Sequence, residues 1–184
     1  RHAQAQVEPT GHVHLDAVLP GGGLPLGALV EVLHESDGTS ELTLLLPLIA
    51  RASRAQRRIV FVNPPYIPYA PAFVAAGVDP SCLHTIKDCG DESLWAAEQC
   101  LRSSTCALVA CWPKQANDRQ LRRLQLAAEG GRAIGIAFRP ARAAMTTSPA
   151  AVRLRAGARG IEVLKCRGGN ARAHAIPISS TARC

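Results

Sequence analysis

Four short runs of apolar residues, separated by segments with helical periodicity, limit most strongly how this chain can fold. Each run is continuous rather than alternating, which is typical of strands covered on both faces. The runs lie at residues 29–33, 59–63, 107–112 and 134–138, and the helical segments at 42–56, 70–76, 91–102 and 118–129. Strands and helices that alternate in this way predict an α/β fold with a mostly parallel central sheet flanked by helices.

The last third of the chain predicts elements of a different kind. Residues 152–154 and 161–164 surround a turn at 157–160, the pattern of a C-terminal β-hairpin extension of the sheet. Residues 141–150, rich in alanine, threonine, serine and proline, are expected to form a mobile loop. We expect one domain over residues 1–184, with 1–12 and 169–184 irregular or flexible.

Composition excludes several classes of protein. With 47% hydrophobic and 19% charged residues, the chain has the balance of a globular protein. No apolar run approaches the length of a membrane span, so we expect no membrane partner. The seven cysteines form no C-x-x-C pair, which favours reduced thiols in a cytoplasmic protein. We expect neither a metal nor a cofactor.

A short polar loop between the first apolar run and the first helix has the position of a phosphate-binding loop. Such a loop needs a first glycine for the turn, a lysine for the phosphates and a hydroxyl for magnesium. Here Leu33 replaces that glycine and Thr39 replaces the lysine, while Gly38 and Ser40 remain. Acidic residues in and beside the loop would repel a triphosphate. The sequence therefore predicts a vestigial loop that binds no nucleotide.

Basic residues are concentrated in the C-terminal third. Residues 1–131 hold 11 Lys/Arg against 13 Asp/Glu, whereas residues 132–184 hold 10 against one. This imbalance predicts contact with single-stranded DNA or with an acidic protein surface. The alternative is a solvated surface that only keeps the protein soluble. The candidate contact residues are Arg139, Arg142, Arg153, Arg155, Lys165 and Arg167.

Tyr66 and Tyr69 form a second candidate contact. Both lie among prolines just after the run at 59–63, where an open α/β sheet places its ligand edge. They predict a rigid partner-binding loop, and the alternative is a structural turn in which proline ends a strand. Trp95 and Trp112 are expected to pack in the core or between a helix and the sheet, and Glu31 to cap or pair locally without a chemical role.

Residues 15–32, 35–43, 59–66, 77–79, 152–155 and 163–165 resemble segments of the RecA ATPase core. The resemblance implies a RecA-like core, but the elements that hydrolyse ATP are lost. The lysine position is Thr39, the catalytic glutamate position is Pro65, and the run at 107–112 contains no acid for the Walker-B aspartate. The resemblance therefore implies that the protein is not an enzyme.

Within RecA-like proteins, the chain resembles the ImuA family of translesion-synthesis proteins, which is related to the SulA-like group. The features that carry this resemblance lie at 19–23, 63–71, 94–99, 121–128 and 165–169, of which the proline-rich 63–71 is the most specific. The resemblance implies a non-catalytic adaptor of an SOS-induced mutasome. Its partners would be ImuB, RecA and an error-prone C-family DNA polymerase complex. The expected location is cytoplasmic and, during activity, at the nucleoid.

Two other functions stay open. A SulA-type inhibitor would bind FtsZ and block its polymerisation. A divergent NTPase would need a lysine or arginine from elsewhere, such as a neighbouring subunit, and the sequence leaves homo-oligomerisation open.

Overall fold

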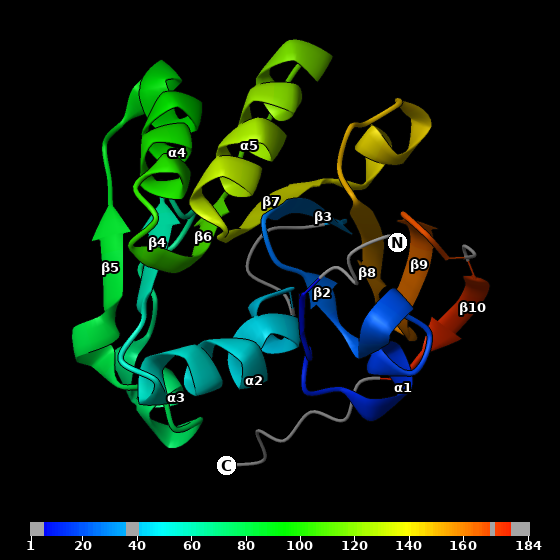
Figure 1. Cartoon of the computed structure of the whole chain (residues 1–184), viewed down its shortest axis with the longest axis horizontal. Coiled ribbons are helices and arrows are strands. Elements are labelled where there is room, and N and C mark those ends of the chain that lie inside the picture. The colour runs from blue at the N-terminus through cyan, green and yellow to red at the C-terminus, as the bar shows by residue number, and fades with distance from the viewer. Residues whose placement is uncertain (1–5, 36–40, 170–171, 178–184) are drawn as a thin grey trace.

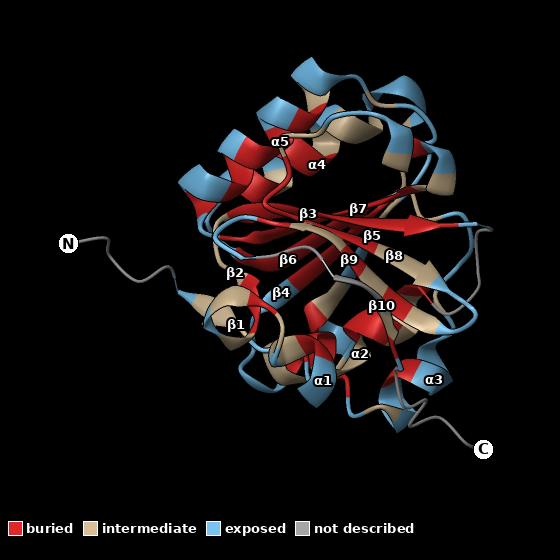
Figure 2. Ribbon diagram, turned by 90° about the vertical axis from the view of Figure 1, so that its right-hand side faces the viewer, coloured by how far each residue is buried: buried red, intermediate tan, exposed pale blue. Residues whose placement is uncertain are grey.

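A sheet of eight strands crosses the molecule, with helices on both of its faces (Figures 1 and 2). The computed structural model describes residues 6–35, 41–169 and 172–177. The strand order in the sheet is β10-β9-β8-β3-β7-β6-β4-β5. These strands are β3 (Ala28–His34), β4 (Arg58–Val62), β5 (Leu83–Ile86), β6 (Cys106–Cys111), β7 (Ile134–Pro140), β8 (Val152–Gly157), β9 (Gly160–Cys166) and β10 (Arg172–Ile176).

The strands from β8 to β5 in this order are parallel, whereas β9 is antiparallel to both β8 and β10. Parallel neighbours need crossover connections, and most of these contain a helix. This arrangement confirms the predicted α/β fold with a mostly parallel sheet and a C-terminal antiparallel extension. The helices are α1 (Val13–Asp16), α2 (Glu41–Arg54), α3 (Ala70–Ala75), α4 (Ser93–Arg102) and α5 (Asp118–Gly131).

Each face of the sheet has its own hydrophobic core. On one face, α4 and α5 cover the sheet, and Leu101 and Leu124 pack in a cluster with Leu29 of β3 (Figure 2). On the other face, α1, α2 and α3 cover it, and Ile49 packs in a cluster with Val30. Neighbouring residues of β3 thus face opposite layers, which explains why the apolar runs are continuous.

Local sequence signals define both ends of α5. Asn117 caps its first turn, because the Asn117 side chain accepts from the Gln120 backbone while the Gln120 side chain accepts from Asn117 N. The last residue is Gly131, and a Cβ there would lie 1.7 Å from the carbonyl oxygen of Leu101. Only glycine therefore allows the end of α5 to lie against the end of α4.

Several elements differ from the sequence-based expectation. Within residues 1–12, β1 (Val7–Glu8) pairs with β2 (Leu24–Pro25), and β10 lies within the predicted irregular C-terminal segment. The predicted loop at 141–150 begins with the 3-10 helix η4 (Ala141–Met145), in which Ala143 is buried. Short edge elements with half-exposed residues carry a weak periodic signal, and β5 was not predicted for this reason.

The two tryptophans lie in different environments. Trp112 packs in an aromatic cluster under the crevice described below, which confirms the expected core role. Trp95, on α4, is 55% exposed, so the expectation that it packs in the core was wrong. The helical spacing around Trp95 does not separate a core face from a solvent face, because polar and apolar residues both flank it.

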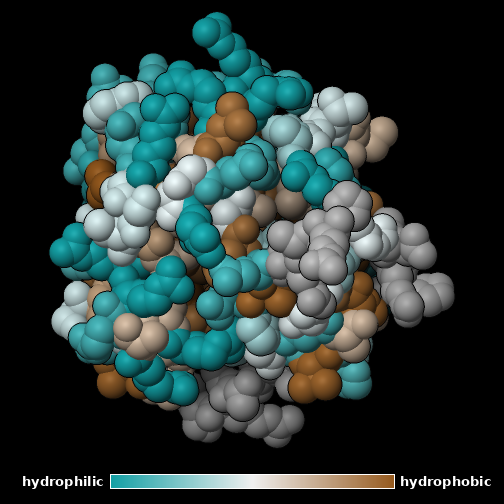
Figure 3. Space-filling model, in the orientation of Figure 1, coloured by the Kyte–Doolittle hydropathy of each residue, from teal (hydrophilic) through white to brown (hydrophobic). Residues whose placement is uncertain are grey.

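Hydrophobic side chains on the face seen in Figure 3 form small patches between hydrophilic ones. In the part of the chain that the structure describes, no helix is both long and apolar enough to cross a membrane.

Candidate functional site

The carboxyl ends of the parallel strands meet at one edge of the sheet and line a crevice. Its walls come from the segments that follow β3, β4, β5, β6 and β7. Open α/β sheets bind their ligands at this edge. Described residues that line the crevice include His34, Asn63, Trp112, Phe138 and Arg142.

The vestigial loop follows β3 at this edge. Leu33, at the position of the first loop glycine, is fully buried in β3, so its side chain belongs to the core. Gly38, Thr39 and Ser40 lie outside the described residues, and their interpretation stays a prediction from the sequence.

Aromatic side chains occupy the end of β6. Trp112 directly follows the last residue of this strand, and its ring stacks on Phe138 with centroids 4.8 Å apart. Phe61 contacts the same indole edge-on at 5.5 Å. The resemblance to ATPases places a magnesium-binding carboxylate at this strand. The indole offers no oxygen, which is the ligand that magnesium requires.

The proline-rich segment after β4 begins with a constrained backbone. Asn63 has a φ of 50°, in the left-handed region, and its N–H donates to the Ile86 carbonyl at 2.7 Å. Two prolines follow, and each fixes its own backbone φ, so the start of the segment is rigid. That Pro65 replaces a catalytic glutamate stays a prediction from the resemblance.

The same segment presents large side chains to solvent. Tyr66 is 64% exposed, Ile67 76% and Tyr69 71%. No charged residue occurs between positions 59 and 78. Beside the tyrosines lies a groove lined mainly by apolar side chains, including Leu42 and Leu46 of α2. Exposed aromatic residues beside such a groove are typical of a protein–protein contact surface.

The structure corrects the sequence-based interpretation of Arg139 and Arg153. Both were predicted to contact DNA or an acidic partner, but they are only 6% and 7% exposed. Arg139 Nη1 and Arg153 Nε each lie 2.5 Å from an oxygen of Glu31, which is fully buried. Two buried guanidinium groups that neutralise a buried carboxylate are part of the interior, and cannot bind phosphate at the surface.

The remaining predicted basic residues lie at or near the surface. Arg142 and Arg167 are exposed, and the Arg155 side chain is 41% exposed. Lys165 is half-buried and donates to the Ser148 carbonyl. Desolvation lowers the pKa of Lys165, and the neighbouring Arg167 and Arg153 lower it further. The β8–β9 hairpin thus carries Arg155, Lys165 and Arg167, but Glu162 pairs with Arg155 at 3.1 Å and offsets part of its charge.

Glu31 is the residue whose role sequence reasoning missed. Its carboxylate holds the side chains of Arg139 and Arg153, which in turn bind backbone carbonyls of neighbouring segments. Arg139 also donates to the Ala116 carbonyl, and Arg153 to the Ala143 carbonyl. The signal was present in the sequence, because a charged residue inside a continuous apolar strand must find a partner in the interior.

Comparison with known proteins identifies two relationships. Over 107 residues the chain is 32% identical to protein RecA of Salinispora arenicola, and over 108 residues 34% identical to protein RecA of Clavibacter michiganensis subsp. michiganensis. Each match covers 58% of this chain but 30% of the relative, so the chain aligns with about a third of the length of these proteins. No family model matches.

Among solved structures, SulA from Pseudomonas aeruginosa is similar with a TM-score of 0.50 and 21% identity, over 60% of this chain and 97% of that chain. At this identity the likeness shows the fold alone. Together with the partial similarity to RecA, it shows a RecA-like α/β fold with C-terminal antiparallel strands.

Proposed function

We propose that the protein is a non-catalytic adaptor in SOS-induced translesion synthesis, which binds ImuB or RecA through the proline-rich segment. One observation carries the proposal. The sheet edge where a RecA-like ATPase acts on nucleotide has an indole after β6 and Pro65 after β4, whereas the tyrosines beside it face solvent. These features favour contact with a protein over phosphate chemistry.

The partial similarity to RecA and the SulA-like fold support an SOS-related role. The error-prone C-family polymerase would join through ImuB, in line with the resemblance to the ImuA family. The β8–β9 hairpin would steer the assembly to DNA through Arg155, Arg167 and Arg159, which is exposed in the turn between the two strands. Exposed cations attract phosphate without reading sequence.

A binding assay with purified ImuB and RecA tests the adaptor role. We expect the joint change of Tyr66 and Tyr69 to alanine to abolish binding while the fold is kept, because both side chains are more than half exposed. The matched control is Leu126→Ala, which removes another exposed hydrophobic side chain, on α5. Unchanged binding of the tyrosine variant would exclude this surface as the contact.

Calorimetric titration with ATP and magnesium tests the absence of catalysis. We expect no heat of binding and no phosphate release, alone or with ImuB present. Micromolar ATP affinity that disappears on Ser40→Ala would contradict the proposal, and turnover only in the complex would indicate a divergent NTPase.

The second candidate is a SulA-type inhibitor, which is favoured by the likeness to SulA over nearly the whole of that chain. It would use the same exposed aromatic surface. Light scattering of FtsZ polymerisation separates the two functions, because an adaptor leaves polymerisation unchanged at stoichiometric concentration.

A further inference from the structure

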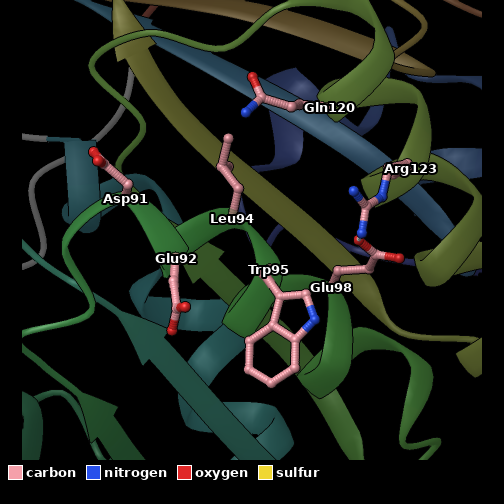
Figure 4. Close-up of a pocket in the computed structure, with 7 residues that line it drawn as sticks. All are labelled: Asp91, Glu92, Leu94, Trp95, Glu98, Gln120 and Arg123. Carbon is pink, nitrogen blue, oxygen red and sulfur yellow. Dashed lines mark ion pairs between the residues drawn. The ribbon is translucent and has the colours of Figure 1, made fainter.

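A cavity of about 390 Å³ lies between the start of α4 and the first turns of α5 (Figure 4). It adjoins the crevice described above, with which it shares Asp91, Leu94 and Gln120. Trp95 forms one side of it, and Glu98 and Arg123 lie on another (Figure 4). Asp91 and Glu92 come from the 3-10 helix η3 (Gly90–Glu92), directly before α4.

The indole of Trp95 is an unusual surface residue. It remains 55% exposed, although α4 buries Ala97 and Leu101 against the sheet. A tryptophan exposes a large apolar ring whose face attracts cations. Its position beside a cavity rather than on a flat surface gives that ring a defined approach.

The lining of the cavity holds three acids, Asp91, Glu92 and Glu98, and one base, Arg123. Residues 88–101 hold four acids and neither lysine nor arginine, in a chain with 21 basic residues. Asp91 and Glu92 make no side-chain hydrogen bond or ion pair with any residue that the structure describes, and neither caps the following helix. Both carboxylates line the cavity, where the Glu92 side chain extends on the side of the Trp95 ring and the Asp91 side chain points the other way (Figure 4).

Glu98 differs from these two acids because its charge is already neutralised. It is buried and pairs with Arg123 at 2.6 Å and Arg102 at 2.8 Å. This pairing joins α4 to α5 and holds Arg123 at the wall. Because Asp91, Glu92 and Glu98 outnumber Arg123 in the lining, the cavity keeps a net negative charge, although Glu98 also pairs with Arg102 outside it.

We propose that this cavity binds an arginine side chain from a basic segment of a protein partner. A guanidinium group stacks on an indole and donates to carboxylates in its own plane, so Trp95 together with Glu92 matches both of its recognition modes, and Asp91 adds negative charge to the same wall. Nucleic acid does not fit, since the two carboxylates repel phosphate. The contact adds a second binding surface to the proposed adaptor, in a cavity that neither Tyr66 nor Tyr69 lines.

Tryptophan fluorescence tests the proposal directly. In Trp112→Phe, Trp95 is the single tryptophan of the chain. The probes are the blocked peptides Gly-Arg-Gly-Arg-Gly and its citrulline counterpart, which keeps the shape of arginine without its charge. We expect the arginine peptide to change the fluorescence of Trp95 in a saturable way. The citrulline peptide should bind more weakly, by on the order of tenfold.

The joint change Asp91→Asn and Glu92→Gln should lower the affinity for the arginine peptide by about tenfold. The matched control is Asp118→Asn, which removes an exposed carboxylate that pairs with Arg122 outside the cavity and should leave binding unchanged. Trp95→Ala should abolish binding of the arginine peptide, measured by calorimetry. Its urea unfolding midpoint should stay unchanged, because the ring is exposed.

Equal binding of the citrulline peptide, or full affinity in the Asp91/Glu92 variant, would overturn the proposal. Self-association that Trp95→Ala abolishes in sedimentation would assign the cavity to a second copy of this chain, and would overturn the assignment to another protein. Loss of ImuB or RecA binding in the Tyr66/Tyr69 variant, with peptide binding intact, separates this contact from the adaptor surface.

Discussion

Arg153 donates from Nε to Oε2 of Glu31 at 2.5 Å, across the parallel pair β8 and β3. The same guanidinium donates to the Ala143 carbonyl in η4 and to the Thr146 carbonyl after it. Glu31 therefore connects the central strand to the segment that follows β7. Because the carboxylate is fully buried, this connection depends on both charges being present.

Replacing Glu31 by glutamine should destabilise the fold strongly. The change leaves Arg139 and Arg153 buried and close together without a counter-charge, which costs about 3–5 kcal/mol in comparable cases. Urea unfolding followed by circular dichroism measures the loss. The control is Glu162→Gln at the partly exposed pair with Arg155, for which we expect less than about 1 kcal/mol. Equal losses at the two sites would contradict the structural role of Glu31.

Truncation of the two tryptophans should change the stability of the fold by very different amounts. Trp112→Ala removes a ring that stacks on Phe138 and contacts Phe61, so a loss of about 3–5 kcal/mol in unfolding free energy is expected. Trp95→Ala should change stability by no more than about 0.5 kcal/mol, the usual range at the surface. Urea unfolding compares both variants with the wild type. A large loss at Trp95 would mean that its ring supports the α4–α5 contact.

The β8–β9 hairpin should account for salt-dependent binding to single-stranded DNA. Changing Arg155, Arg159 and Arg167 together to glutamine should reduce affinity for an oligothymidine and make the slope of log K against log salt shallower by about 2, at roughly 0.7 for each phosphate contact. Arg153 stays in place, since it is interior. Fluorescence anisotropy at several salt concentrations measures both quantities. The control variant changes Arg119 and Arg122 on α5, and an equal effect there would contradict a role for the hairpin.

The thiol of Cys111 should be inert in the folded protein. Burial raises its pKa to about 12, from an ordinary value near 9. The folded state thus keeps the proton while the unfolded chain loses it, so stability should be unaffected below pH 9 and should fall as the pH rises from 9 towards 12. Alkylation at pH 8 with peptide mapping should label the half-buried Cys89 before Cys111. Early labelling of Cys111 would show that the end of β6 opens.

The central strands and their helices could be predicted from the sequence alone. Continuous apolar runs such as 29–33 and 134–138 identify strands covered on both faces, and the helical periodicity at 118–129 predicts most of α5. These signals are local, because periodicity depends on residues a few positions apart. The degenerate loop and the exposed tyrosines could also be proposed from residue types and their place after a strand.

What only the tertiary structure decided is which charged and aromatic residues meet. Arg139 and Arg153 look like their basic neighbours in the sequence, yet 108 and 122 positions separate them from the carboxylate they neutralise. Trp95 is of a residue type that usually packs in the core, but the packing of α4 against the sheet and α5 leaves its ring exposed. Local sequence determined the elements of this protein, whereas burial and long-range pairing determined which side chains remain for function, because both depend on how distant segments pack together.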